Sequence, residues 1–171
     1  MSLEFLLDLP EFKALVEKLK EGEDCLNLSG LIPESRAYFY ALLAAQIDRP
    51  VVIIEPQAWP LEEIKQEIKS ILGFFSRRRR VESLPALSTD PYLEVPVPLD
   101  MVASRMKVLY SLSQGHQPII LTNLAGLLKR VPRPDDLAQL VVRINRGQAC
   151  DRDVLLQQLA DYGYTQEDLV S

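Results

Sequence analysis

Residues 25–46 read CLNLSGLIPESRAYFYALLAAQ, and this stretch decides which fold the chain can adopt. The apolar run Cys25–Ser29 predicts a strand, and Gly30 after it permits a tight turn. Pro33 suits the first position of a helix because its φ angle is already fixed near the helical value. A strand, a glycine turn and a helix together form the frame in which phosphate-binding loops occur.

The chemistry of a phosphate-binding loop is missing from this frame. Aligned with the motif G-x-x-x-x-G-K-[ST], the segment from the glycine onwards reads GLIPESRA. Pro33 cannot donate a backbone N–H to a phosphate, and the carboxylate of Glu34 would repel one. Ser35 stands where the second glycine belongs, Arg36 replaces the lysine, and Ala37 lacks the hydroxyl that would bind Mg²⁺. The segment is therefore either a degenerate loop that binds no nucleotide or an ordinary turn between a strand and a helix.

The composition is that of an ordinary globular protein. The chain has 171 residues, of which 47% are hydrophobic and 25% charged, and its formal net charge is −5. This acidic balance argues against a protein that binds nucleic acid over its whole surface. No apolar run approaches the ~18 residues of a membrane span, and the acidic start lacks the basic region of a signal peptide. Two cysteines and one histidine offer little material for a metal site or a histidine-based triad, so we expect a cytoplasmic protein without a metal.

Predicted strands and helices alternate along most of the chain. Short apolar runs predict strands at residues 25–29, 51–54, 80–84 and 118–122. Apolar residues at helical spacing predict helices at residues 11–20, 33–47, 61–72 and 100–113. We expect Val51–Ile54 to be buried on both faces, and Val102, Met106 and Leu109 to lie on the buried side of their helix. The alternation predicts an α/β fold, a three-layer parallel sheet of the P-loop NTPase type.

The proline-rich segment at residues 131–134 marks a boundary, because the pattern changes after it. Leu140–Ile144 predicts a strand for which the sequence offers no partner. A further helix is predicted between Asp151, which can cap its start, and Gly163, which can end it. The predicted domains are residues 1–134 and, as the incomplete beginning of a second domain, residues 135–171.

Residues 84–110 read LPALSTDPYLEVPVPLDMVASRMKVLY, and they resemble the N-terminal module of the bacterial transcription-repair coupling factors, the Mfd family. The segment 28–39 and the late segment Leu155–Asp168 agree with the same family, so the resemblance covers nearly the whole chain. The matching positions are Leu84-Pro85, Pro91-Tyr92, Pro96, Pro98, Arg105-Met106 and Leu109-Tyr110.

This family is related to the excision-repair subunit UvrB, whose first domain has a working phosphate loop. The resemblance implies that residues 30–37 are the decayed remnant of that loop, which favours this interpretation over the ordinary turn. UvrB proteins also carry an aromatic hairpin that grips DNA, whereas Leu93–Leu99 contains no aromatic residue. The resemblance therefore implies a chain that is not an enzyme, has no cofactor and does not grip a lesion.

The same resemblance implies partners for the full-length protein. In this family it is an ATP-dependent DNA translocase that acts on stalled RNA polymerase and recruits UvrA to begin nucleotide-excision repair. UvrA binds the second domain, and the residues that contact it are expected mostly beyond Ser171. The first domain is expected to contact other domains of the full-length protein.

Two alternative functions remain open from the sequence. A run of arginines could neutralise phosphates and give weak, salt-sensitive binding to nucleic acid, although cations are also favoured at the end of a helix before a solvated turn. An enzyme that uses nucleotide would need a Mg²⁺-binding carboxylate at a strand end. Only Glu55 qualifies, and we expect it to face solvent or cap an element because Pro56 follows it. The arginines of the run are Arg77, Arg78, Arg79 and Arg80.

Overall fold

The computed structural model describes residues 3–56, 60–75, 79–87, 97–139, 141–142 and 144–166. The chain divides into two compact units, Met1–Val131 and Pro132–Ser171. The assignment of the two parts to a UvrB-like domain and to the start of a UvrA-binding domain stays a prediction. Several residues named above lie outside the described residues: Arg77, Arg78, Pro91, Tyr92, Pro96 and Asp168.

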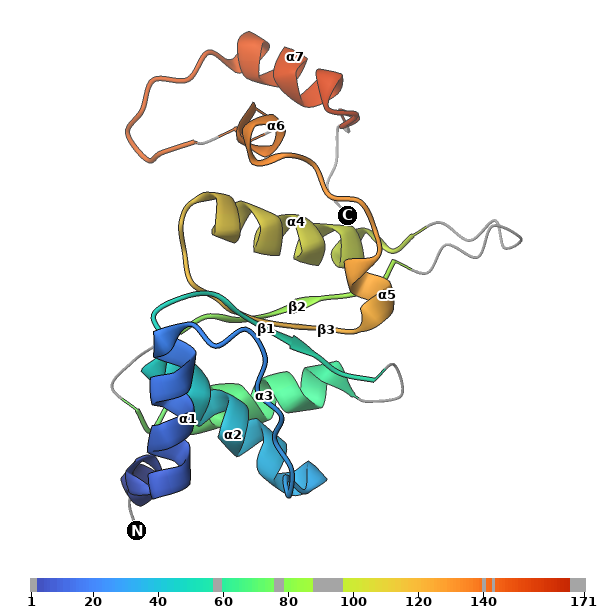
Figure 1. Cartoon of the computed structure of the whole chain (residues 1–171). Helices are drawn as coiled ribbons and strands as arrows, with labels where there is room; N and C mark the ends of the chain where they lie inside the picture. The colour runs from blue at the N-terminus through green and yellow to red at the C-terminus, as the bar shows by residue number, and fades with distance from the viewer. Residues whose placement is uncertain are drawn as a thin grey trace, which may run out of the picture. The chain divides into compact units, whose positions relative to one another are not determined.

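A three-stranded parallel sheet forms the centre of the first unit (Figure 1). Its strands β1 (Val51–Ile54), β2 (Val81–Leu84) and β3 (Ile119–Thr122) lie in the order β1-β3-β2. The central strand β3 is paired on both sides, and all of its residues are buried. The predicted α/β class with parallel strands is therefore confirmed.

Helices cover both faces of this sheet (Figure 1). α2 (Arg36–Gln46) and α3 (Leu61–Leu72) pack together on one face, and α4 (Leu99–Ser113) packs on the other. Side chains of β3 alternate between the two cores: Ile119 and Leu121 pack among residues of α2 and α3, and Ile120 packs against α4. The alternation follows from the pleat of a strand, whose successive side chains point to opposite faces.

The N-terminal helices pack beside α2. A 3₁₀ helix, η1 (Leu3–Asp8), is followed by α1 (Pro10–Glu21), whose buried residues Phe12 and Val16 contact Leu42. α1 ends at Gly22, which has a φ of 91°, a left-handed conformation that glycine adopts without strain. The helix predicted at residues 11–20 is thereby confirmed.

The predicted strand at Cys25–Ser29 is absent, and that prediction was wrong. These residues have no regular structure; Cys25 is exposed and Leu28 is 51% exposed. An apolar run becomes a strand only where a neighbouring strand satisfies its backbone groups, and β1 pairs only with β3 in the described part of the chain. Gly30 does take a positive φ of 87°, and the 3₁₀ helix η2 (Pro33–Ser35) then leads into α2.

Two predictions of burial also need correction. β1 is not buried on both faces, because Val52 and Ile54 are 49% and 54% exposed on the side of the sheet that α4 covers only over β2 and β3. In α4 the buried residues are Arg105, Val108 and Ser111, rather than the predicted side. Apolar residues occur all around this helix, so the sequence pattern does not single out one stripe.

The second unit contains α6 (Pro134–Gln139) and α7 (Arg152–Asp161); the sequence had not predicted α6. The predicted strand at Leu140–Ile144 is not formed by Val141, Val142 or Ile144, the residues of this segment that the structure describes. A lone strand is not stable without a neighbour, and the described residues of this unit provide none.

The predicted ends of α7 are confirmed. The carboxylate of Asp151 accepts hydrogen bonds from the N–H groups of Asp153 and Val154 at 2.9 and 3.3 Å, as an N-cap does. At the other end Gly163 has a φ of 84°, and the N–H of Tyr164 donates to the carbonyl oxygen of Leu159 at 3.0 Å. Among the described residues, no helix has the length and apolar character that crossing a membrane requires.

Candidate functional site

The carboxyl edge of the sheet is the place where open parallel α/β sheets bind ligands. β1 reaches this edge at Glu55, whose N–H donates to the carbonyl oxygen of Thr122 at 2.9 Å. β3 leads into α5 (Leu124–Leu127), whose N-cap Asn123 accepts a hydrogen bond from the N–H of Gly126. The start of α2, which follows residues 30–35, brings Arg36 to the same edge.

Glu55 is buried rather than solvent-facing, so that expectation was wrong. The residue is 3% exposed. Its Oε2 lies 3.4 Å from Nη1 of Arg36, and its Oε1 accepts a hydrogen bond of 2.6 Å from the hydroxyl of Tyr40. Arg36 and Tyr40 lie four residues apart on α2 and therefore share one side of the helix. The buried carboxylate is thus compensated by one cation and one hydroxyl.

This arrangement also fixes the protonation of Tyr40. Burial of the ring, the hydrogen bond to Glu55 and the negative charge of Glu55 raise the pKa of Tyr40 to about 12, while Arg36 opposes the shift. The hydroxyl therefore stays protonated at neutral pH and donates to the carboxylate. It offers no general base.

Arg36 and Glu55 form an ion pair, whereas a nucleotide site would need both charges free to contact its ligands. Arg36 stands at the lysine position of the loop motif, and Glu55 stands at a strand end, where a carboxylate could hold Mg²⁺. In the ion pair each charge is neutralised by the other rather than offered to a ligand.

The other residues at the positions of the loop motif also lack the groups that the motif needs. Ala37 is 3% exposed and packs in the core with residues of α3, so the Mg²⁺-ligand position of the motif is filled by a buried methyl group. Pro33 and Glu34 are exposed, and the Ser35 hydroxyl donates to the carbonyl oxygen of Ile32 at 2.9 Å. Among the described residues no three histidine, cysteine, aspartate or glutamate side chains gather as a metal site.

Arg79 of the arginine run has a structural position. Its guanidinium donates to the carbonyl oxygens of Ala44, Ile47, Arg49 and Gln117 at 2.6–3.0 Å. These carbonyls lie at the end of α2 and in the segments that precede β1 and β3. Arg79 therefore joins elements at the amino edge of the sheet, opposite the candidate site. Binding of nucleic acid by the run as a whole stays a prediction.

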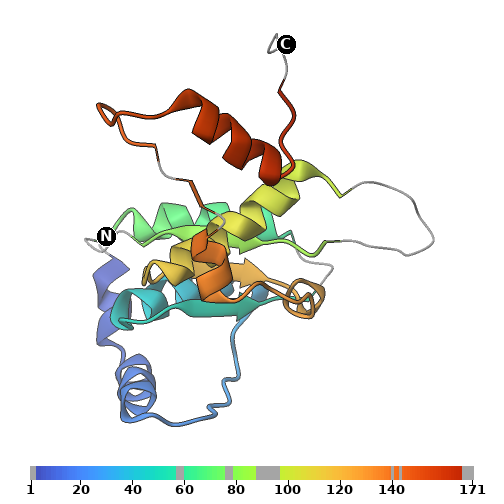
Figure 2. The same cartoon turned by 90° about the horizontal axis from the view of Figure 1, so that it is seen from above.

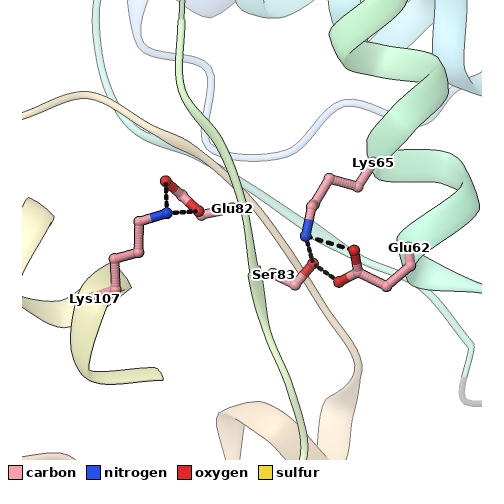
Figure 3. Close-up of polar contacts among 5 residues, drawn as sticks. All are labelled: Glu62, Lys65, Glu82, Ser83 and Lys107. Carbon is pink, nitrogen blue, oxygen red and sulfur yellow. Dashed lines mark hydrogen bonds and ion pairs between the residues drawn. The ribbon is translucent and has the colours of Figure 1, made fainter. Parts of the chain in front are cut away.

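Polar side chains of β2 bind the helices on both faces of the sheet (Figure 3). Toward α3, the Ser83 hydroxyl donates to Glu62 at 2.5 Å and accepts from Lys65 at 3.2 Å, and Lys65 also pairs with Glu62. Toward α4, Glu82 pairs with Lys107 at 3.1 Å. Hydrogen bonds from Lys65 and then from Ser83 lower the pKa of Glu62. These contacts anchor β2, an edge strand of the described sheet, to α3 and α4.

No family model matches the chain. The chain is 24% identical to the transcription-repair-coupling factor of Bacillus subtilis (strain 168), an alignment that covers 98% of this chain and 14% of that protein. For the transcription-repair-coupling factor of Myxococcus xanthus the identity is 28%, over 93% of this chain and 13% of the relative. UvrABC system protein B of Chlorobium phaeobacteroides is 21% identical, over 91% of this chain and 24% of the relative.

The homologues of this chain are transcription-repair-coupling factors and UvrB proteins. The resemblance read from residues 84–110 is thereby confirmed. The chain spans only about an eighth to a quarter of the length of these relatives. Homology alone therefore does not assign the activities of the whole proteins to this chain.

Arg105, one of the residues that carry this resemblance, has a role that the sequence analysis missed. It is 4% exposed, and its Nη1 donates to the carbonyl oxygens of Pro85 and Gly126 at 2.8 and 2.9 Å. Burial lowers the pKa of Arg105 below its ordinary value. A Cβ on Gly126 would stand 2.9 Å from the carbonyl oxygen of Leu84, so a glycine is required for α5 to approach this closely. The sequence offers no signal for the burial of Arg105, because the apolar residues of α4 do not mark one side of the helix.

Proposed function

We propose that this chain is a non-catalytic, nucleotide-free interaction module of a transcription-repair coupling factor. The observation that carries this proposal is the ion pair of Arg36 and Glu55, reinforced by Tyr40. A functional phosphate site needs a free cation at the loop and a carboxylate free to hold Mg²⁺. Here the two groups neutralise each other and link α2 to β1, which gives them a role in the fold.

The homologues support the wider setting of this module. Their names, transcription-repair-coupling factor and UvrABC system protein B, belong to DNA repair. We infer that the first part of the chain keeps the architecture of a P-loop NTPase domain with a degenerate loop and serves as a scaffold. The part after residue 134 would lead into the domain that binds UvrA, with most of the contacts beyond Ser171. DNA and RNA polymerase would be partners of the full-length, ATP-dependent translocase in the cytoplasm.

Titration with Mg-ATP tests the proposal. We expect no binding heat in calorimetry and no shift of the melting temperature at millimolar Mg-ATP. A nucleotide present at about 100 times its Kd would add about 2.7 kcal/mol to the stability, which a melting experiment resolves. Micromolar binding of Mg-ATP by the wild-type chain would contradict the proposal.

A variant that restores the motif residues sharpens this test. Arg36→Lys with Ala37→Thr returns the lysine and the hydroxyl of the motif, but Pro33 and Glu34 remain and no strand precedes the turn. We expect this variant, once circular dichroism shows that it folds, to bind no more ATP than the wild type. ATP binding by the variant would show that the frame of the loop is intact.

A further inference from the structure

A groove runs between the start of α2 and the exposed side of α3, next to the degenerate loop. It encloses about 650 Å³. η2 and α2 line one side, α3 lines the other, and the mostly buried Ile64 of α3 is among the lining residues. The residues that give the groove its character are Glu34, Tyr38, Glu63, Glu67 and Phe74.

The described residues that line this groove carry charge of one sign. Glu34, Glu63 and Glu67 contribute carboxylates, and no lysine, arginine or histidine occurs among the described residues that line it. All three glutamates are exposed, and Glu63 and Glu67 lie four residues apart on α3, so they form one acidic stripe. A hollow of this kind attracts cations and rejects phosphates.

Aromatic rings border the same groove. Phe74, just after α3, is 75% exposed, and Tyr38 on α2 is 43% exposed. Exposed rings beside carboxylates suit a guanidinium in particular, because it stacks on a ring and still donates hydrogen bonds to a carboxylate. An ammonium binds as a point charge and gains less from the ring.

Two residues that depart from the phosphate-loop motif, Pro33 and Glu34, belong to this surface. Pro33 and Glu34 both line the groove, so the substitutions that remove phosphate binding also shape one wall of it. The same segment of chain therefore presents a carboxylate to solvent at the position where a phosphate loop presents backbone N–H groups.

We propose that this groove is a docking surface for a partner protein, through a segment that carries arginine beside an apolar side chain. The arginine would pair with Glu63 or Glu67 and stack on Phe74 or Tyr38, and the apolar side chain would cover Ile64. This surface lies in the first unit and does not depend on whether the chain binds ATP.

Fluorescence anisotropy with a labelled peptide of alternating arginine and leucine tests this surface. We expect saturable binding to the full chain, weaker binding of the same peptide with lysine in place of arginine, and none with glutamate. Glu63→Gln with Glu67→Gln should weaken binding of the arginine peptide about tenfold. Phe74→Ala should weaken it several-fold, and because this ring is 75% exposed its removal should leave the fold intact.

A matched control separates the groove from the general negative charge of the protein. Glu17→Gln with Glu21→Gln changes the charge equally, at two exposed residues that lie four apart on α1. We expect this control to bind the arginine peptide like the wild type. An equal loss in both pairs of variants, unchanged affinity in the Phe74 variant, or no saturable binding by the wild type would overturn the proposal. Titration with Mg-ATP is independent of all these outcomes.

Discussion

Glu55 shows at the scale of one residue how a charge is retained in the interior. An isolated buried carboxylate is strongly unfavourable, and this one persists because Arg36 and Tyr40 compensate it at 3.4 and 2.6 Å. Removing either Arg36 or Tyr40 leaves the carboxylate of Glu55 only partly compensated. At neutral pH we therefore expect Tyr40→Phe to lower the free energy of unfolding by about 1–2 kcal/mol.

Tyr40 also predicts how stability depends on alkaline pH. Its pKa is raised from 10.0 to about 12 in the folded chain, first of all by burial. Between these values the unfolded chain has released the proton and the folded chain still holds it, so stability falls as pH rises. The contribution is complete below pH 10 and is lost as pH passes about 12.

Urea denaturation across this pH range measures the effect. We expect the wild-type chain to lose stability more steeply with pH than Tyr40→Phe. Tyr38→Phe, which removes a hydroxyl from an exposed ring of the same helix, should follow the wild type. Equal slopes for the wild type and Tyr40→Phe would show that folding does not raise the pKa of Tyr40.

At the scale of elements, the ends of helices and strands are held together by a few polar side chains. Ser83 and Glu82 join β2 to α3 and α4 (Figure 3). Arg105 joins α4 to Pro85, which follows β2, and to Gly126 of α5. Such contacts satisfy backbone and edge groups that a three-stranded sheet cannot satisfy alone.

The contribution of Arg79 to stability can be tested directly by substitution. Its guanidinium satisfies carbonyl oxygens at the end of α2 and before β1 and β3. We expect Arg79→Ala to lower the free energy of unfolding by about 2–4 kcal/mol, because the carbonyls lose a charged donor. Arg79→Lys should recover only part of this, since an ammonium cannot reproduce the planar fork.

Arg80→Ala is the matched control for Arg79→Ala in thermal and urea denaturation. Arg80 is exposed, and we expect its removal to change stability by less than about 0.5 kcal/mol. Equal effects of the two variants would contradict the structural role of Arg79. The same variants also refine any test of DNA binding, because a fourfold arginine variant that includes Arg79 would confuse lost binding with lost stability.

At the scale of the whole molecule, the sheet has a protected centre and an open border. β3 is paired on both sides and buried, whereas β1 has one free side in the described chain and exposes Val52 and Ile54 (Figure 2 shows the sheet from above). Residues 25–29, which would be a strand in a phosphate-loop frame, have no strand structure.

Native-state hydrogen exchange tests this description. We expect the amides of Ile119–Thr122 to exchange only through global unfolding and those of Leu26–Leu31 to exchange nearly unprotected. Val51–Ile54 should lie between these limits. Protection of residues 26–29 as strong as that of β1 would show that a fourth strand forms and that the frame of the loop is complete.

The sequence by itself determined the elements that depend on local signals. The apolar stripe of α3, the caps of α7 at Asp151 and Gly163, and the class of the sheet follow from spacing and backbone preferences, which act within a few residues. The replaced groups of the loop motif could also be read directly, because their chemistry resides in each side chain.

Only the tertiary structure decided which of these residues meet. Glu55 was expected at the surface, Cys25–Ser29 was expected in the sheet, and Arg105 was not expected inside; each outcome depends on neighbours distant in the sequence. The pairing of Arg36 with Glu55 joins residues 19 positions apart. Whether a strand is buried on one face or two, and whether a charge is compensated, is set by the elements packed around it, and no local pattern carries that information.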